Sequence, residues 1–369
     1  MTTPDKYAAS GVDEPREQAA LASMLRAFSR TYSLRSGSGS PNTEEDHFGS
    51  LINITKDIVL AISTDGVGTK LLIAQDTCRY REIAHDLIAN NVNDILCMGA
   101  EPVAFVDYIG LDVADEQFLT EFAEGLADAA VEARVSIVGG EIAQIGTMLN
   151  PAHRSPRFDV VGTAVGLCSI GGGDTWPAGL SRRNVAEGSC LIALPSSGLH
   201  SNGFSLARSA LLDEGGLDLF EPVESMGNKA LFEHLLVPTK IYVKQVLPLL
   251  KKGLLQGVAN ISGGGLLTIS RLNPTASFVV DSVPEPSPIF QLIQNSGSLT
   301  NVEMCSTFNM GLGFVLAVDQ SNVSEVQSML EQIQEPFFLI GRVTDDLPPG
   351  TVDVPPLKIR GKGHRFESR

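Results

Sequence analysis

The stretch AISTDGVGTKLL, residues 61–72, interrupts an apolar run with groups suited to phosphate chemistry. Asp65 offers a carboxylate, Gly66 and Gly68 leave the backbone flexible, and Lys70 adds a positive charge before the apolar run resumes. Backbone N–H groups next to glycine can approach a phosphate closely, and Mg²⁺ prefers carboxylate oxygens that it shares with phosphates. A turn within a core strand would not need a carboxylate and a lysine in this order, so the stretch points to a binding site.

Further glycine-rich turns bring acidic, amide or imidazole side chains to the ends of strands or the starts of helices. They are SIVGGEIA with Glu141, VANISGGGL with Asn260, SSGLHSNGFSL with His200, Ser201 and Asn202, and TFNMGLGF with Asn309. A Gly-Gly pair alone usually marks only a turn. Several such turns beside several acids indicate one large polyphosphate and metal site, because glycine N–H groups and helix N-termini bind phosphate. The chain has no Walker, dinucleotide-binding or protein-kinase motif, so the ATP site would be of an unusual type.

The segment REIAHDLIANNVNDILCMGAEP, residues 81–102, predicts a helix that is apolar nearly all round except for one narrow stripe. At about 100° per residue the stripe contains Asp86, Asn90, Asn93, Asp94 and Cys97. A buried carboxylate is costly unless it is paired or binds a cation. We interpret Asp94 as a metal ligand, and the alternative is a polar network between helices.

Alternating strands and helices must position these groups. In the first half we expect strands at 58–63, 103–108, 135–139 and 159–168, and helices at 15–29, 80–98 and 116–133. In the second half we expect strands at 190–194, 276–281, 311–318 and 336–343, and helices at 203–213, 239–252, 264–271 and 322–333. This alternation predicts an α/β fold with mixed sheets and leaves parallel and antiparallel strand order open.

The domain boundary is expected near residue 170. Residues 1–57 would form an N-terminal helix and a mobile loop, residues 58–170 the first domain, and residues 171–369 a second α/β domain. The 369 residues are enough for two domains with their own cores.

Composition excludes several classes of protein. The net charge of -16 argues against a nucleic-acid binder, which needs basic patches. No stretch of about 18 apolar residues predicts a membrane span, and the N-terminus does not resemble a signal peptide. The five cysteines are scattered, which is typical of reduced thiols in a cytoplasmic protein and argues against a zinc site.

A set of motifs occurs in the order found in one known family. They are TDGVGTKL, NDILCMGAEPVAFVDY, VGGE, DVVGTAVG, LIALPSSGLHSNGFSL, PTKIYVK, SGGGL and FNMGLGF. From about residue 5 to about residue 345, the chain closely resembles the aminoimidazole ribonucleotide synthetases, or phosphoribosylformylglycinamidine cyclo-ligases. Single motifs also occur in selenophosphate synthetase, the hydrogenase-maturation dehydratase, thiamine-monophosphate kinase and the amidotransferase of the preceding purine step. GLHSNGFSL and PTKIYVK favour the cyclo-ligases.

The resemblance implies a reaction and an assembly. Formylglycinamidine ribonucleotide would be closed to aminoimidazole ribonucleotide in purine biosynthesis, with ATP and Mg²⁺ used and ADP and phosphate released. Such chemistry depends on positioning and charge neutralisation more than on a covalent nucleophile. The implied fold has two α/β domains, and strands of the first domains of two subunits form an intersubunit barrel. We therefore expect a cytoplasmic homodimer with nucleotide near its interface, a ribonucleotide phosphate as substrate, and neither nucleic acid nor membrane as partner.

The resemblance also implies roles for single residues. The expected Mg²⁺ ligands are Asp65, Asp94 and Glu141, and the expected catalytic residues are Lys70, His200 and Asn260, with Lys70 neutralising phosphate charge. ATP would be bound by Phe48, Gly49, Gly66, Gly68, Lys70, Asn90, Gly139 and Gly140. The ribonucleotide would be bound by Ser197, His200, Ser201, Asn202, Gly263, Gly264 and Gly265. Three residues have an alternative: Lys70 as a surface lysine, His200 as a helix-capping or core histidine, and Glu141 in a strand-end ion pair.

Three places depart from the family pattern. Asn260 stands where the family usually has histidine, and an amide cannot act as an acid or base near neutral pH. Ile142 and Gln144 replace a threonine and a glutamate. The loop at 36–50 has lost glycines and gained Glu44, Glu45 and Asp46, which repel a triphosphate unless they bind metal. These changes keep two alternatives open: a related ATP-dependent enzyme that phosphorylates another small-molecule oxygen, and a nucleotide-binding homologue without catalysis.

Overall fold

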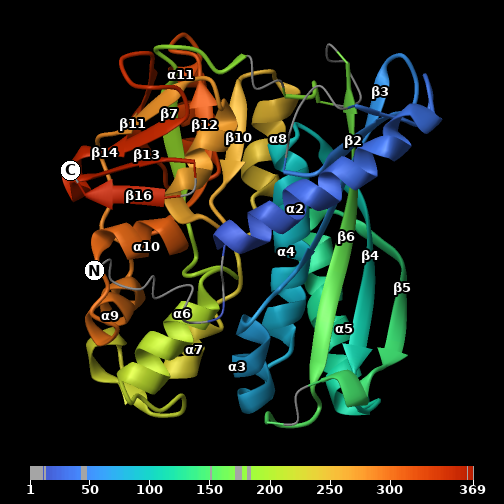
Figure 1. Ribbon diagram of the computed structural model, residues 1–369, viewed down its shortest axis with the longest axis vertical. Coiled ribbons are helices and arrows are strands. Elements are labelled where there is room, and N and C mark those ends of the chain that lie inside the picture. The colour runs from blue at the N-terminus through green and yellow to red at the C-terminus, as the bar shows by residue number, and fades with distance from the viewer. Residues whose placement is uncertain are drawn as a thin grey trace.

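Two mixed sheets organise the chain, as the computed structural model shows (Figure 1). The structure describes residue 11 and residues 14–42, 48–149, 152–170, 177–180, 184–363 and 365–368. The acidic loop residues Glu44, Glu45 and Asp46 therefore lie outside the described residues. The α/β fold class expected from the sequence is confirmed, and the open question of strand order is answered, because both sheets combine antiparallel pairs with one parallel pair.

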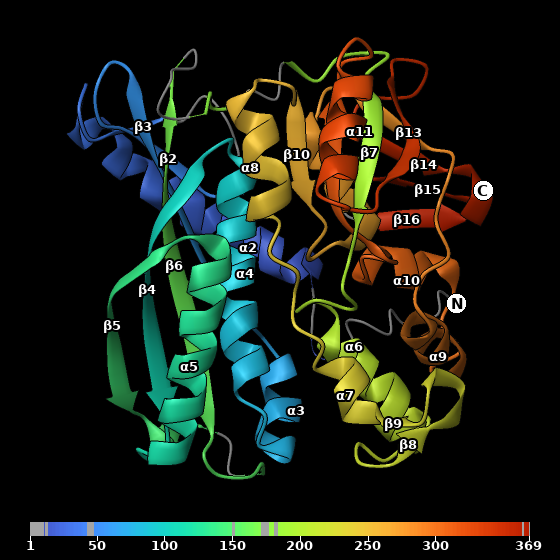
Figure 2. The same cartoon turned by 180° about the vertical axis from the view of Figure 1, so that it is seen from behind.

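The first sheet has the strand order β1-β2-β3-β6-β4-β5. Its strands are β1 Ser40–Asn42, β2 Ser50–Asn53, β3 Ile58–Gly66, β4 Glu101–Leu111, β5 Ser136–Gln144 and β6 Phe158–Ser169. The pair β4–β5 is parallel, which requires a crossover, and α5 (Glu116–Ala133) supplies it. α5 and α4 (Arg81–Cys97) cover one face of this sheet (Figure 2). On β6 the residues facing these helices, such as Phe158, Val160 and Ala164, are buried, and their neighbours along the strand are more exposed.

The second sheet has the strand order β10-β12-β7-β13-β11-β14-β15-β16. Its strands are β7 Cys190–Pro195, β10 Gly257–Asn260, β11 Ser277–Val280, β12 Leu312–Val318, β13 Phe338–Thr344, β14 Thr351–Val354, β15 Ile359–Lys362 and β16 Arg365–Ser368. Every residue of β12 is buried, as expected for an apolar strand covered on both faces. A short hairpin of β8 Pro222–Val223 and β9 Lys229–Ala230 lies apart from both sheets.

The remaining helices are mostly short. They are α2 Glu14–Phe28, α3 Lys70–Thr77, α6 Phe204–Arg208, α7 Leu231–Leu235, α8 Val243–Lys251, α9 Pro288–Ser296, α10 Asn301–Thr307 and α11 Val323–Gln332. The 3₁₀ helices are η1 Ser29–Leu34, η2 Gly146–Met148, η5 Glu224–Met226, η6 Gly265–Leu272 and η7 Pro355–Leu357, and η4 Ser209–Glu214 is a π-helix. Among the described helices none is both long and apolar enough to cross a membrane.

Most expected elements are present, with informative exceptions. The helix expected at 239–252 begins only at Val243, because residues 239–242 run as an irregular segment along α4. The helix expected at 203–213 is a short α6 followed by a π-helical turn, and that at 264–271 is the 3₁₀ helix η6. No element was predicted at α3, α9, α10, β10 or the C-terminal strands β14–β16.

Candidate active site between the two sheets

The polar stripe of α4 faces the second half of the chain. The Asp86 carboxylate accepts hydrogen bonds from Thr239 N at 2.7 Å and from Thr239 Oγ1 at 2.6 Å. Asn93 donates to Lys240 O at 2.9 Å and accepts from Tyr242 N at 3.1 Å. The alternative of a polar network is therefore correct for Asp86 and Asn93. Their partners lie in the irregular segment 239–242 and not on another helix, which explains why that part of PTKIYVK is not helical.

Lys70 differs from both interpretations made of it. Its side chain is 0% exposed, and its Nζ lies 2.7 Å from Asp86 Oδ2, which is equally buried. The same ammonium group donates to His200 O at 3.1 Å and to Val237 O at 2.9 Å. Burial lowers the pKa of Lys70, and the charge and hydrogen bond of Asp86 oppose that shift. Lys70 is thus no surface lysine, and because it is completely buried and paired with Asp86, this geometry gives no direct phosphate contact.

Asp94 and Asn260 meet between the two sheets. Asn260 Nδ2 donates to Asp94 Oδ1 at 3.0 Å, and Asn260 N donates to Cys97 Sγ at 3.2 Å. Burial raises the pKa of Asp94 to about 7, the hydrogen bond from Asn260 opposes this, and the charge of Asp65 adds to it. Burial likewise raises the pKa of Asp65. Two of the expected metal ligands are therefore close enough to repel each other electrostatically.

Glu141 does not join them. Asp65 of β3 lies opposite Gly162 of β6, and Asp107 of β4 lies opposite the same glycine, so these two aspartates share a face of the sheet. Glu141 lies opposite Tyr108, one position further on, and thus belongs to the other face. Across the described residues no three His, Cys, Asp or Glu side chains form a group that could hold a metal. The expected three-carboxylate set is therefore not assembled within one chain. The strand-end ion pair is not formed either, since Glu141 has no such partner in the described part.

Asp107 is a nearby acid that the sequence did not single out. A Cβ built at Gly140 would lie 1.8 Å from Asp107 Oδ1, so a larger residue would displace this carboxylate from its present position. Burial raises the pKa of Asp107. Gly140, expected at the nucleotide, thus has a structural reason of its own, and Gly139 next to it is exposed on the edge strand.

The turn after β3 is arranged as an open backbone loop. Asn90 Nδ2 donates to Gly66 O at 2.9 Å, and Asn91 Oδ1 accepts from Asp65 N at 3.0 Å, so two amides of α4 fix the strand end. Gly68 has φ 72° and no atom within 4 Å of a Cβ built there. The loop therefore has the open, glycine-specific conformation that a close backbone contact with a ligand requires.

The glycine-rich turns of the second half converge on the same place. Thr69 Oγ1 and Ser205 Oγ lie 3.0 Å apart, which joins the loop after β3 to the start of α6. A Cβ built at Gly263 would lie 3.4 Å from Asn202 Oδ1, so the turns HSNG and SGGG are neighbours. Gly264 and Gly265 have φ values of 85° and 55° and form the start of η6.

The loop that carries His200 is braced from several sides. Ser197 Oγ donates to Pro238 O at 2.6 Å, and Ser201 Oγ lies 3.1 Å from Thr239 Oγ1. Asn309 Nδ2 donates to Gly198 O at 2.9 Å, which gives the turn FNMGLGF a bracing role. His200 itself is 3% exposed and its Nε2 accepts from Ser197 N at 3.3 Å. Burial, with the charges of Lys70 and Lys240, lowers the pKa of His200 to about 3, so the ring is neutral and the alternative of a core histidine describes its surroundings.

Phe48 and Gly49 lie against both halves of the chain. A Cβ built at Gly49 would lie 2.5 Å from Ile62 O and 2.7 Å from Met98 Cε, so only glycine allows this approach. The Phe48 ring packs on the guanidinium group of Arg271, with Cζ 4.1 Å from the ring centroid. Arg271 is also the positive charge that lowers the pKa of Asp94. The sequence did not single out Arg271; the available signal was one arginine in the segment directly after the glycine triplet.

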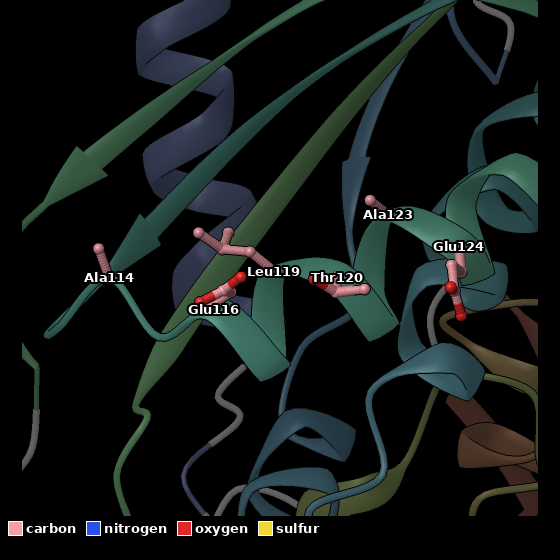
Figure 3. Close-up of a pocket in the computed structure, with 6 residues that line it drawn as sticks. All are labelled: Ala114, Glu116, Leu119, Thr120, Ala123 and Glu124. Carbon is pink, nitrogen blue, oxygen red and sulfur yellow. The ribbon is translucent and has the colours of Figure 1, made fainter.

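Hollows lie along α5, and one of them is lined by Asp107, Gly140 and Glu141 together with Leu119 and Phe122 of that helix. Figure 3 shows another of them, lined by Ala114, Glu116, Leu119, Thr120, Ala123 and Glu124. None of these side chains was expected at a site, and none contacts the cluster formed by Phe48, Asp65, Asp94, Asn260 and Arg271. We call that cluster the interdomain site.

Comparison with known proteins finds one family and its members matching most of the chain. Residues 48–168 match the profile of the AIR synthase related protein, N-terminal domain, and residues 186–350 match that of the AIR synthase related protein, C-terminal domain. A phosphoribosylformylglycinamidine cyclo-ligase of Thermococcus kodakarensis is 39% identical over 341 residues, which is 92% of this chain and 96% of that protein. The enzyme of the same name from Methanococcus maripaludis strain C5 is 36% identical over 344 residues, 92% of this chain and 93% of that protein.

A solved structure has the same fold at low sequence identity. The thiamine-monophosphate kinase from Stenotrophomonas maltophilia K279a is 19% identical, has a TM-score of 0.59, and the match covers 88% of this chain and 93% of the kinase.

Proposed function

Because the chain belongs to the AIR synthase related family, we propose that it closes formylglycinamidine ribonucleotide to aminoimidazole ribonucleotide, using ATP and releasing ADP and phosphate. The chain is an enzyme of purine biosynthesis, a carbon–nitrogen ligase. The observation that carries this is the 39% identity over 92% of the chain to a phosphoribosylformylglycinamidine cyclo-ligase, whose length is matched to 96%.

The reaction has two bond-making steps. The formyl oxygen attacks the γ-phosphorus of ATP, so an O–P bond forms and the bond to ADP breaks. The amidine-derived nitrogen then attacks the formyl carbon, and a C–N bond forms. The C–O bond of that carbon breaks, phosphate leaves, and the nitrogen loses a proton. Both steps depend on alignment and on neutralising phosphate charge.

Asp65 and Asp94 fit a role in holding Mg²⁺ with ATP. The charge of Asp65 adds to the raised pKa of Asp94, which is the condition that a divalent cation would relieve. Mg²⁺ usually takes one or two protein carboxylates and completes its shell with phosphate oxygens and water, so two carboxylates are sufficient. When bound, the ion would neutralise charge on the triphosphate. Asn260 orients Asp94 through its hydrogen bond, and being an amide it does not transfer protons near neutral pH.

We assign the ribonucleotide to the turns 200–202 and 263–265, and ATP to the loop after β3 and to Phe48. The open conformation of Gly68 and the contact between Gly263 and Asn202 support this assignment. His200 would stabilise the conformation of the turn as a neutral ring. Lys70 would stabilise the same turn through its hydrogen bond to the His200 carbonyl.

A homodimer is proposed from the uncovered part of the first sheet. β5 is an edge strand with Val138 66% exposed, and Val106 and Tyr108 on the neighbouring strand are 37% and 38% exposed. An edge strand with exposed apolar residues is a surface that another chain can pair with or cover. Glu141 belongs to this surface.

We also propose a cytoplasmic location, to which five free cysteines are suited. A domain boundary is proposed near residue 170, since the first sheet ends at Ser169 and the second begins at Cys190.

The proposal is tested by following phosphate release from ATP with formylglycinamidine ribonucleotide, and separately with other small phosphate acceptors, in the presence of Mg²⁺. Release that depends on the ribonucleotide supports the cyclo-ligase. Release with only another acceptor, or nucleotide binding with no release at all, would contradict it.

A further inference from the structure

We propose that Arg271 of η6 contacts a phosphate group of the bound nucleotide at the interdomain site. This inference rests on the function proposed above and gives the phosphate-binding charge to a residue that the sequence did not indicate. The sequence assigned that charge to Lys70.

Lys70 is excluded from direct contact by its surroundings. Its side chain is 0% exposed, and its ammonium group is within bonding distance of Asp86 Oδ2, His200 O and Val237 O. Two of its donors go to backbone carbonyls, Asp86 neutralises its charge, and its complete burial leaves a ligand no access. A triphosphate bound beside Asp65 and Asp94 still needs a cation, because these carboxylates repel it.

Arg271 stands where such a cation is needed. Among the described side chains that shift the pKa of Asp94, Arg271 is the positive one, and it also acts on Cys97 one turn further along α4. The residue is exposed, so a ligand can reach it. Its charge therefore acts on the carboxylate that we assign to Mg²⁺ while remaining open to solvent.

The guanidinium group is held in place without its donors being used. It packs on the Phe48 ring with Cζ 4.1 Å from the centroid. Within the described part of the chain it has neither a hydrogen bond nor an ion pair. A guanidinium that stacks on an aromatic ring keeps its N–H donors free in its own plane, and these donors match two phosphate oxygens at once.

Phe48 is itself fixed, which makes the arrangement preorganised. Gly49 lies so close to Ile62 O and Met98 Cε that any larger residue would displace it. The contact of Gly49 with β3 and the end of α4 therefore places the backbone beside Phe48, and the ring itself packs partly buried against the core. A cation held in advance loses less conformational entropy when the ligand binds.

We expect Arg271 to bind ATP and not the ribonucleotide, because its neighbours are residues assigned to ATP. Phe48 and Asp94 are residues that we assign to ATP and its metal. Gly263 and Asn202, which we assign to the ribonucleotide, lie at the opposite end of η6.

The test compares the full-length wild type with Arg271→Met and Arg271→Lys. Arg342→Met is the matched control, because Arg342 is an exposed arginine of β13 paired with Asp281 and lies outside the site. Calorimetry with Mg²⁺ measures the Kd for ATP and for adenosine, and steady-state kinetics measure the KM for ATP and for the ribonucleotide. Melting temperature is recorded for all four proteins.

We expect Arg271→Met to weaken ATP binding at least about tenfold, in the range of a lost charge-assisted contact. Adenosine binding, the KM for the ribonucleotide and the melting temperature should not change, Arg271→Lys should recover part of the ATP affinity, and the control should match the wild type. Three results would overturn the inference: unchanged ATP affinity, an equal loss for adenosine, or a rise only in the KM for the ribonucleotide. A wild type that binds ATP but forms no product would refute the proposed function and leave the binding comparison readable.

Discussion

Lys70 and Asp86 form an ion pair of 2.7 Å in which both side chains are 0% exposed. The pair joins the start of α3 to α4, and through His200 O and Thr239 N it reaches two segments of the second half of the chain. The motifs TDGVGTK, GLHSNG and PTKIYVK are therefore connected by one buried charge pair. This pair therefore holds the two halves in register around the interdomain site.

Breaking this pair should destabilise the protein strongly. Lys70→Met leaves Asp86 as a buried charge without its partner, and Asp86→Asn does the same to Lys70, so each should lower the free energy of unfolding by about 3–5 kcal/mol. The double variant Lys70→Met/Asp86→Asn should lose less than the sum, because no unpaired charge remains. Chemical denaturation of the four proteins measures this cycle. Single variants within about 0.5 kcal/mol of the wild type, as for ordinary surface changes, would show that the pair does not join the two halves.

His200 should make the protein sensitive to mild acid. Its pKa is about 3 in the folded state, below the ordinary 6.5, so as pH falls from 6.5 towards 3 the unfolded chain takes up a proton that the folded chain does not. Folding stability is then lost on the acid side, by about 2 kcal/mol between pH 7.5 and pH 5. In His200→Asn, which tolerates the φ of 62° at this position, this part of the pH dependence should vanish.

Denaturation of wild type and His200→Asn at both pH values measures the difference in slope, and the absolute stabilities do not enter. The other histidines are the same in both proteins, so their contribution cancels. Equal slopes would mean that His200 titrates in the folded protein as it does in the unfolded chain.

Mg²⁺ dependence should change around neutral pH. The pKa of Asp94 is about 7, and the carboxylate must lose its proton to bind a cation, so the half-saturating Mg²⁺ concentration should rise as pH falls below 7. Asn260→Leu removes the donor that lowers this pKa, and the rise should then begin at higher pH. Activity measured over Mg²⁺ concentration at pH 6, 7 and 8 follows the shift, and EDTA should abolish activity in both proteins. A requirement for Mg²⁺ that does not vary with pH would exclude Asp94 as a ligand.

The exposed edge strand should control the assembly state. Val138→Asp places a charge on β5, where Val138 is 66% exposed, and should convert the proposed dimer to a monomer, seen by light scattering after size exclusion. Val131→Asp is the matched control, since Val131 is 78% exposed on α5 and does not belong to the strand edge. A wild type that is monomeric, or a Val138→Asp variant that stays dimeric, would contradict the proposed interface.

Local periodicity was enough to predict α4 and α5, but not α3 or β10, which carry Lys70 and Asn260. The helix α5 was expected at its observed bounds, Glu116–Ala133, because its apolar spacing is regular and Asp115 caps it by accepting from Phe118 N at 2.7 Å. The polar stripe of α4 was also recognised from spacing alone. What the stripe contacts could not be predicted, because Thr239 and Asn260 are brought to it only by the packing of the second half against the first.

The positions of Lys70 and Glu141 could not be predicted for the same reason. Lys70 appeared suited to phosphate because it follows glycines, but its partner Asp86 lies one helix further along and buries it completely. Glu141 directly follows the glycine pair 139–140, as the motif suggested. Its position in β5 nevertheless puts it on the opposite face of the sheet from Asp65. Arg271 carried no motif, and it became visible only through its contact with Phe48.

The most direct measurement is the ATP-dependent formation of aminoimidazole ribonucleotide from formylglycinamidine ribonucleotide with Mg²⁺ by the pure protein, with Asp94→Ala beside it. We expect product from the wild type and none from Asp94→Ala, while both proteins stay folded by circular dichroism. Absence of product from a wild type that binds ATP would contradict the cyclo-ligase assignment, and undiminished product from Asp94→Ala would contradict the site.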